Sequence, residues 1–151
     1  MIVDNLPYVI EFNVRMGDPE TQVVIPKISS SLLSMFDCCL DGNLKDYKIE
    51  FDDKFHVTVV LASKGYPEEY KTGQNIIGFD NLEDGFLFHA GTKLDDNKIV
   101  VSGGRVLNVI GIGKDLNTAI QSAYNKIDKI NFEGISYRSD IGLKGLKKEV
   151  L

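Results

Sequence analysis

One segment sets the architecture at the start of this chain: Tyr8-Val-Ile-Glu-Phe-Asn-Val-Arg-Met-Gly-Asp-Pro-Glu-Thr-Gln22. Apolar and polar residues alternate through its first half, and this period of two predicts an extended strand over Tyr8 to Val14. Successive side chains of a strand point to opposite faces. We therefore expect one face to enter a core, with Ile10, Phe12 and Val14, and the other face to carry Glu11, Asn13 and Arg15.

Turn and helix signals surround this strand. Asp4 to Pro7 have turn chemistry and follow the extended run Met1 to Val3, so the start of the chain predicts a hairpin. Thr21 to Ile25 predict a short helix. Apolar residues then recur every three or four positions from Ser30 to a stop at Gly42, which predicts a second helix with an apolar face.

The chain changes character near residue 48. Short β-branched and aromatic runs separated by glycine-bearing turns follow, and they predict an antiparallel sheet over Phe55 to Ala62, Gly85 to Thr92, Lys98 to Val101 and Arg105 to Gly113. One helix interrupts the sheet, capped by Asp115, with apolar positions Leu116, Ala119, Ile120, Ala123 and Ile127 on one face. The fold class is therefore α+β, with a first domain over 1–47 and a small sheet or half-barrel domain with one helix over 48–151.

Composition narrows the class of protein. The 151 residues are 43% hydrophobic, enough for an ordinary core, and the net charge of -5 gives no general attraction to nucleic acid or to an anionic membrane. No apolar run approaches the ~20 residues of a spanning helix, and no signal peptide follows Met1. The two adjacent cysteines, Cys38 and Cys39, suit core positions in a reducing cytoplasm rather than a metal site.

The polar residues on one face of the first strand are candidates to bind a metal ion. A carboxylate and an amide oxygen two residues apart can converge on one hard cation, and magnesium prefers such oxygens. Alternation alone favours the alternative, a sheet with one solvated face. The rigid turn Gly17-Asp-Pro19, directly beside this face, favours a site, because polar residues on such turns more often serve function.

The run Glu-Phe-Asn-Val-Arg-Met-Gly-Asp-Pro-Glu-Thr-Gln at residues 11–22 resembles the signature of the glycinamide ribonucleotide synthetases, also called phosphoribosylamine-glycine ligases. Its first part is shared across the ATP-grasp enzymes, and its second part is specific to this family. Further blocks resemble the family in the same order, at residues 57–67, 88–93, 103–109 and 137–142. The resemblance implies a cytoplasmic ligase of purine biosynthesis that joins glycine to phosphoribosylamine through glycyl phosphate.

The resemblance also implies roles for residues of the first strand and its turn. Glu11 and Asn13 match the ligands of the magnesium, or manganese, that bridges the phosphates of ATP. Arg15 matches the arginine that faces the acyl phosphate, although an ion pair with Asp18 or Glu20 is an alternative. Asp18 and Glu20 are candidates to position a substrate amine, or they brace the turn.

Two basic residues of the second domain are candidates for substrate phosphate. Lys93 and Arg105 each follow glycines at a strand end, where bare backbone can approach an anion. A solvated surface is the alternative for both. His89 lies in an apolar run, which is typical of a hydrogen-bonded structural histidine, and the turn from Lys64 to Pro67 is a candidate rim of the site.

The nucleotide-binding loop and adenine slot of an ATP-grasp enzyme have no counterpart upstream of these blocks. The resemblance therefore implies a carboxyl-terminal portion whose amino-terminal part is elsewhere, and we expect the isolated chain to be inactive. Two other hypotheses are a non-catalytic binding module and one half of a split ATP-grasp enzyme. The partners of the complete enzyme would be glycine, phosphoribosylamine and ATP.

Overall fold

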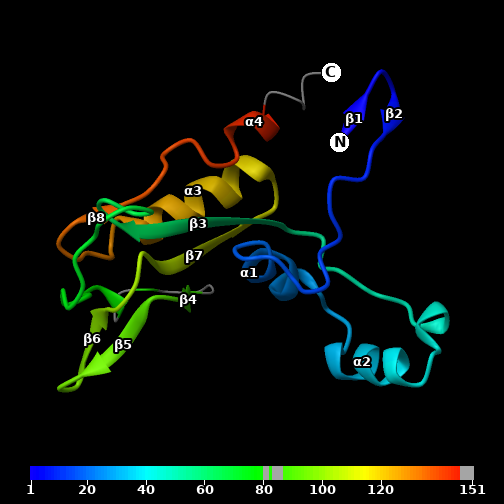
Figure 1. The fold of residues 1–151 in the computed structure, drawn as a ribbon, viewed down its shortest axis with the longest axis horizontal. Helices are drawn as coiled ribbons and strands as arrows, with labels where there is room; N and C mark the ends of the chain where they lie inside the picture. Colours follow the sequence, from blue (N-terminus) through cyan, green and yellow to red (C-terminus); the bar gives the residue numbers. More distant parts are fainter. Residues whose placement is uncertain (80–81, 83–86, 147–151) are drawn as a thin grey trace.

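A computed structural model describes residues 1–79, 82 and 87–146 (Figure 1). Its centre is a four-stranded antiparallel sheet in the order β4-β7-β3-β8. The two long strands are β3 (Phe55–Ser63) and β7 (Arg105–Gly113), and they pair with each other along almost their whole length. The edge strands are β4 (Leu87–His89) and β8 (Ile135–Ser136). The α+β class predicted from the sequence is confirmed.

Helix α3 (Leu116–Ile127) covers one face of this sheet, as Figure 1 shows. Asp115 caps the helix, because its side chain accepts a hydrogen bond from the Thr118 N–H, as predicted. The predicted apolar face of α3 is buried at Ala119, Ile120, Ala123 and Ile127. These side chains join a core that is supplied mainly by the two long strands, at Val57, Val59, Leu61, Leu107 and Val109.

A separate two-stranded ribbon leaves the sheet. It consists of β5 (Thr92–Asp95) and β6 (Lys98–Val101), which run antiparallel. The predicted run from Gly85 to Thr92 is thus divided between β4 and β5, and its first two residues lie outside the described residues. A short second helix, α4 (Leu143–Leu146), follows β8 and was not expected.

The first part of the chain begins with the predicted hairpin, but this hairpin is short. Strands β1 (Ile2–Val3) and β2 (Leu6–Pro7) flank Asp4 and Asn5, whose positive φ angles form the two-residue turn. The predicted strand from Tyr8 to Val14 is wrong for this chain, since no strand among the described residues pairs with it beyond Tyr8. Its expected core face is open to solvent: Ile10 is 69% exposed, Phe12 86% and Val14 97%.

The helices of the first part follow the predicted positions. They are α1 (Thr21–Val24), the 3-10 turn η1 (Ile25–Lys27), α2 (Leu32–Leu40) and the 3-10 turn η2 (Leu44–Asp46). Ser31 caps α2, and Gly42 follows it with a positive φ angle. The apolar face of α2 covers no core in this chain, because none of its residues is buried. The core placement of Cys39 was therefore wrong: it is a free, exposed cysteine.

A polar cluster of Lys27, Asp52 and His56 connects the first part of the chain to the start of β3. The Asp52 carboxylate contacts Lys27 Nζ at 3.3 Å and His56 Nε2 at 2.9 Å. Burial raises the pKa of the Asp52 carboxyl, but hydrogen bonds from His56, the Lys54 N–H and Lys27 outweigh this effect and leave its pKa lowered. The stabilisation is therefore present above the ordinary carboxyl pKa and is lost as the pH falls through the lowered value.

Candidate functional site

The predicted metal ligands lie on the extended segment that follows the hairpin. The Asn13 side-chain amide donates a hydrogen bond to Glu11 Oε1 at 3.3 Å, so the two side chains lie together, and both residues are exposed. The two side chains are neighbours although the segment is not paired in a sheet, and their convergence on a cation stays a prediction. Arg15 follows with its Nη1 donating to the Met16 carbonyl oxygen at 3.0 Å.

Glu11 and Asn13 fit part of a magnesium site. They supply one carboxylate and one amide oxygen, which are hard ligands, and magnesium normally takes its remaining positions from phosphates and water. Within the described ranges no group of three His, Cys, Asp or Glu side chains could hold a metal ion. One carboxylate and one amide leave most positions around such a cation to phosphate oxygens and water.

The turn after Arg15 contacts the sheet through an ion pair between two predicted site residues. Arg105 Nη2 lies 2.9 Å from Asp18 Oδ2, and Arg105 Nη1 donates to the Asp18 carbonyl oxygen at 3.3 Å. The other Asp18 oxygen accepts from Gln22 Nε2 at 3.1 Å. Asp18 thus pairs with Arg105 and not with Arg15, so the alternative Arg15–Asp18 ion pair is not formed.

The Asp18–Arg105 ion pair leaves N–H donors of Arg105 available for a ligand. The side chains of Arg105 and Asp18 are 39% and 45% exposed. A guanidinium has five N–H donors in a planar fork, so two contacts to Asp18 leave further donors for an anion. Glu20 lies on the same turn, and its carboxylate packs against Gly17, where an added Cβ would meet Glu20 Oε2. The structure therefore brings Asp18, Glu20 and Arg105 to one place.

Lys93 lies two residues after Gly91, whose backbone N–H donates to the Arg105 carbonyl oxygen at 2.7 Å. It is on the β5-β6 ribbon, where its Nζ pairs with Asp95 Oδ2 at 3.3 Å and both side chains are more than half exposed. His89 Nδ1 lies 3.0 Å from Thr92 Oγ1, which agrees with the structural histidine expected there.

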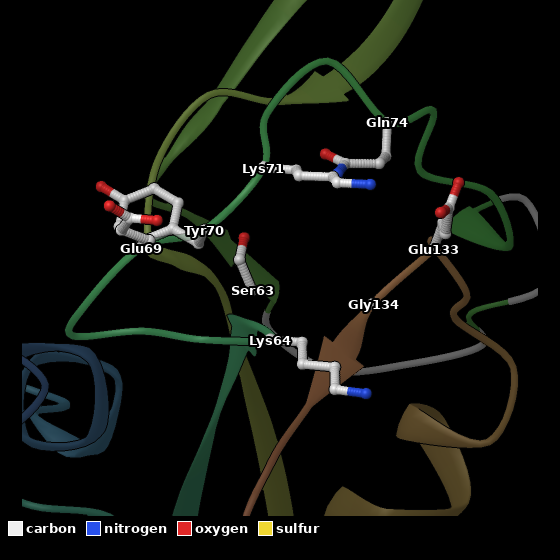
Figure 2. Close-up of a pocket in the computed structure, with 8 residues that line it drawn as sticks. All are labelled: Ser63, Lys64, Glu69, Tyr70, Lys71, Gln74, Glu133 and Gly134. Atoms are coloured by element: carbon white, nitrogen blue, oxygen red, sulfur yellow. The ribbon is translucent and has the colours of Figure 1, made fainter.

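Sequence reasoning missed most of a pocket at the end of β3. We call it the β3-end pocket; its cavity is about 410 Å³, and its lining includes Ser63, Lys64, Glu69, Lys71, Gln74 and Glu133. Figure 2 shows that these residues come from the end of β3, the loop after it and the loop before β8. Only Lys64 had been singled out, as part of a rim turn, because the sequence does not reveal that these loops meet.

Comparisons with known proteins identify the class. Residues 56–144 match the family described as "Phosphoribosylglycinamide synthetase, C domain". A phosphoribosylamine–glycine ligase of Caldanaerobacter subterraneus is 47% identical over 141 residues, which are 93% of this chain and 34% of that protein. The bifunctional purine biosynthetic protein purD of Dictyostelium discoideum is 45% identical, over 95% of this chain and 18% of its own length.

A solved structure agrees. The crystal structure of the phosphoribosylamine–glycine ligase from Thermotoga maritima superposes with a TM-score of 0.76 at 37% identity, covering 93% of this chain and 34% of that one. The chain belongs to the phosphoribosylglycinamide synthetase family. It spans about a third of the length of the phosphoribosylamine–glycine ligases it matches. The matched C domain lies within the predicted second domain, and the boundary at residue 48 stays a prediction.

No helix in residues 1–79, 82 and 87–146 has both the length and the apolar character required to cross a membrane.

Proposed function

We propose that this chain is the carboxyl-terminal portion of an ATP-grasp phosphoribosylamine-glycine ligase, working in the cytoplasm in purine biosynthesis. The observation that carries the proposal is the Asp18–Arg105 contact. It attaches the segment that bears Glu11, Asn13 and Arg15 to the sheet of the family's C domain. One chain thereby presents candidate groups for the cation, the acyl phosphate and the acceptor substrate on connected elements.

Glu11 and Asn13 are the proposed holders of magnesium or manganese. A cation bound with ATP reduces repulsion between the phosphates and an incoming carboxylate, and it stabilises the charge on the departing ADP. The Glu11 carboxylate lies beside the Asn13 side-chain amide, and both residues are exposed. The remaining ligands would come from the nucleotide, water and the rest of the enzyme.

Arg15 and Asp18 are the proposed catalytic residues. Arg15 has a planar fork able to hold two oxygens of an acyl phosphate. Asp18 keeps the turn and Arg105 together through its carboxylate and its carbonyl oxygen. Glu20, Lys93 and Arg105 are proposed to bind substrate, with Glu20 suited to an ammonium group and the two cations suited to phosphate. Lys93 would have to exchange its present partner, Asp95.

The test follows an oxygen atom. Glycine labelled with ¹⁸O in its carboxylate is given to a reconstituted enzyme, made of this chain and the part of the Caldanaerobacter ligase that it does not match. A carboxylate oxygen attacks the terminal phosphorus of ATP, ADP leaves, and the amine of phosphoribosylamine then displaces phosphate from the acyl carbon. We expect one ¹⁸O atom in each phosphate released, measured by mass spectrometry.

The control omits phosphoribosylamine, and little labelled phosphate should then accumulate. Unlabelled phosphate formed together with amide product would contradict the glycyl phosphate route. Phosphate release that needs neither glycine nor phosphoribosylamine would contradict the assignment as this ligase.

A further inference from the structure

The β3-end pocket has a lining that calls for a particular kind of ligand. Two lysines, Lys64 and Lys71, and two glutamates, Glu69 and Glu133, line the same cavity. None of these four side chains has an ion pair or side-chain hydrogen bond to another described residue. A ligand that satisfies both signs must carry an anionic group together with hydrogen-bond donors.

A buried acceptor strengthens this requirement. The Oε1 atom of Gln74 is buried without a hydrogen-bond partner among the described residues, and Gln74 lines the pocket. Leaving a buried amide oxygen unpaired is costly, so a hydroxyl or amine of a bound molecule would be favoured there. Ser63 cannot supply that donor, because its hydroxyl donates to the Gly103 carbonyl oxygen at 3.1 Å.

The lining disfavours other ligand classes. Two carboxylates oppose a polyphosphate such as ATP, and the charged groups oppose a hydrocarbon chain. A cavity of about 410 Å³ falls within the range of small-molecule sites and is much larger than glycine requires. A sugar that carries one phosphate fits both conditions, since the phosphate can meet the lysines and the hydroxyls can meet Gln74 and the carboxylates.

The pocket also lies at the end of the sheet that carries Arg105. The Ser63 N–H donates to the Gly104 carbonyl oxygen at 2.8 Å, and Ala62 pairs with Arg105 across the two long strands. The pocket and the Asp18–Arg105 contact are therefore at the same end of β3 and β7. A ligand anchored in the pocket is within the same region as the candidate acceptor groups.

We propose that the β3-end pocket binds the ribose 5-phosphate portion of the acceptor amine, with Lys64 and Lys71 on the phosphate and Gln74 on a hydroxyl. This assignment rests on the proposed function and adds residues to it. The pocket lysines, Lys64 and Lys71, join Lys93 and Arg105 as candidate phosphate contacts.

Binding is measured first, without any ligation. Isothermal titration calorimetry of the reconstituted enzyme with ribose 5-phosphate should give saturable binding, and ribose should bind at least about 10-fold more weakly, because a charged hydrogen-bonded group is lost. Inorganic phosphate and glycine are titrated in the same way. Glycine competing with ribose 5-phosphate would show that the pocket takes the amino acid and would overturn the proposal.

Variants then locate the site. The double variant Lys64→Gln, Lys71→Gln should bind ribose 5-phosphate at least about 10-fold more weakly. Its KM for phosphoribosylamine should rise by a similar factor, while kcat changes little, because ground-state and transition-state binding are lost equally. Both lysines are exposed, so the fold should tolerate the changes. The matched control is Lys45→Gln, an exposed lysine on η2, and it should change neither constant more than about twofold.

The outcomes separate the two proposals. Ligation with an unchanged KM in the double variant would overturn the pocket assignment and leave the ligase assignment standing. Lysine-dependent binding of ribose 5-phosphate by an enzyme that transfers no ¹⁸O would leave the pocket standing and remove the ligase assignment.

Discussion

Gly111→Val is expected to destabilise the sheet domain by about 3 kcal/mol or more. A Cβ at position 111 would overlap the carbonyl oxygen of Ala119 and the backbone nitrogen of Ala123. Both atoms belong to the backbone of α3, so the whole helix would have to move away from β7. Because a domain of this size has only about 5–15 kcal/mol of stability, a large part of the population would unfold under mild denaturant.

Urea denaturation followed by far-ultraviolet circular dichroism measures this effect. Ile112→Val is the matched control, since it changes the next residue of the same strand, and a lost methylene at a half-buried site should cost at most about 1.5 kcal/mol. Equal unfolding free energies for Gly111→Val and Ile112→Val would show that α3 does not lie so closely on β7.

Glu11→Gln is expected to lower the kcat of the reconstituted enzyme at least about 100-fold. The substitution keeps the shape of the side chain and removes the negative charge that would hold the cation on the phosphates. Loss of groups that merely support metal ligands often costs 10–100-fold, so loss of a ligand should cost at least as much. The segment is exposed and outside the core, so folding should be unaffected.

Steady-state assays of ADP formation over a range of magnesium concentrations measure this loss, and the variant should need more magnesium for half-maximal rate. Glu50→Gln provides the matched control, because Glu50 is an exposed carboxylate whose salt bridge to Lys48, at 3.6 Å, lies on the surface. A kcat for Glu11→Gln within about threefold of the unmodified chain would remove Glu11 from the metal site.

The second domain was largely predictable because its signals are local. The bounds of β7 were predicted as observed, and α3 follows from a cap at Asp115 and apolar residues spaced by three and four. These elements bury their apolar faces against each other, so the pattern in the sequence and the packing in the structure agree. The division of the run before Thr92 into β4 and β5 was missed, because it depends on which strand pairs with which.

The first part was less predictable because several of its apolar residues pack on no core among the described residues. Alternation at Ile10, Phe12 and Val14 is a strand pattern, but a strand requires a neighbour to accept its hydrogen bonds. Leu33 and Phe36 on α2 likewise form an apolar face and stay 71% and 52% exposed. Such faces are typical of surfaces that other protein covers, in agreement with relatives about three times as long.

The candidate site, like the fold, was predictable from the sequence only in part. The proximity of Glu11 and Asn13 follows from their spacing along an extended backbone and was foreseen. The Asp18–Arg105 contact joins residues 87 positions apart, and no local pattern encodes it. The β3-end pocket depends on the end of β3 and two loops meeting, so only the folded chain reveals that Lys64, Lys71 and Gln74 line one cavity.

The central claim is that this chain completes a phosphoribosylamine-glycine ligase, and the rate of ADP formation tests it most directly. The chain, the complementary part of the Caldanaerobacter ligase and their mixture are each supplied with ATP, magnesium, glycine and freshly generated phosphoribosylamine. The account predicts turnover only in the mixture, and only when both co-substrates are present. Turnover by the chain alone, or a stable complex of the two parts that forms no ADP, would contradict it.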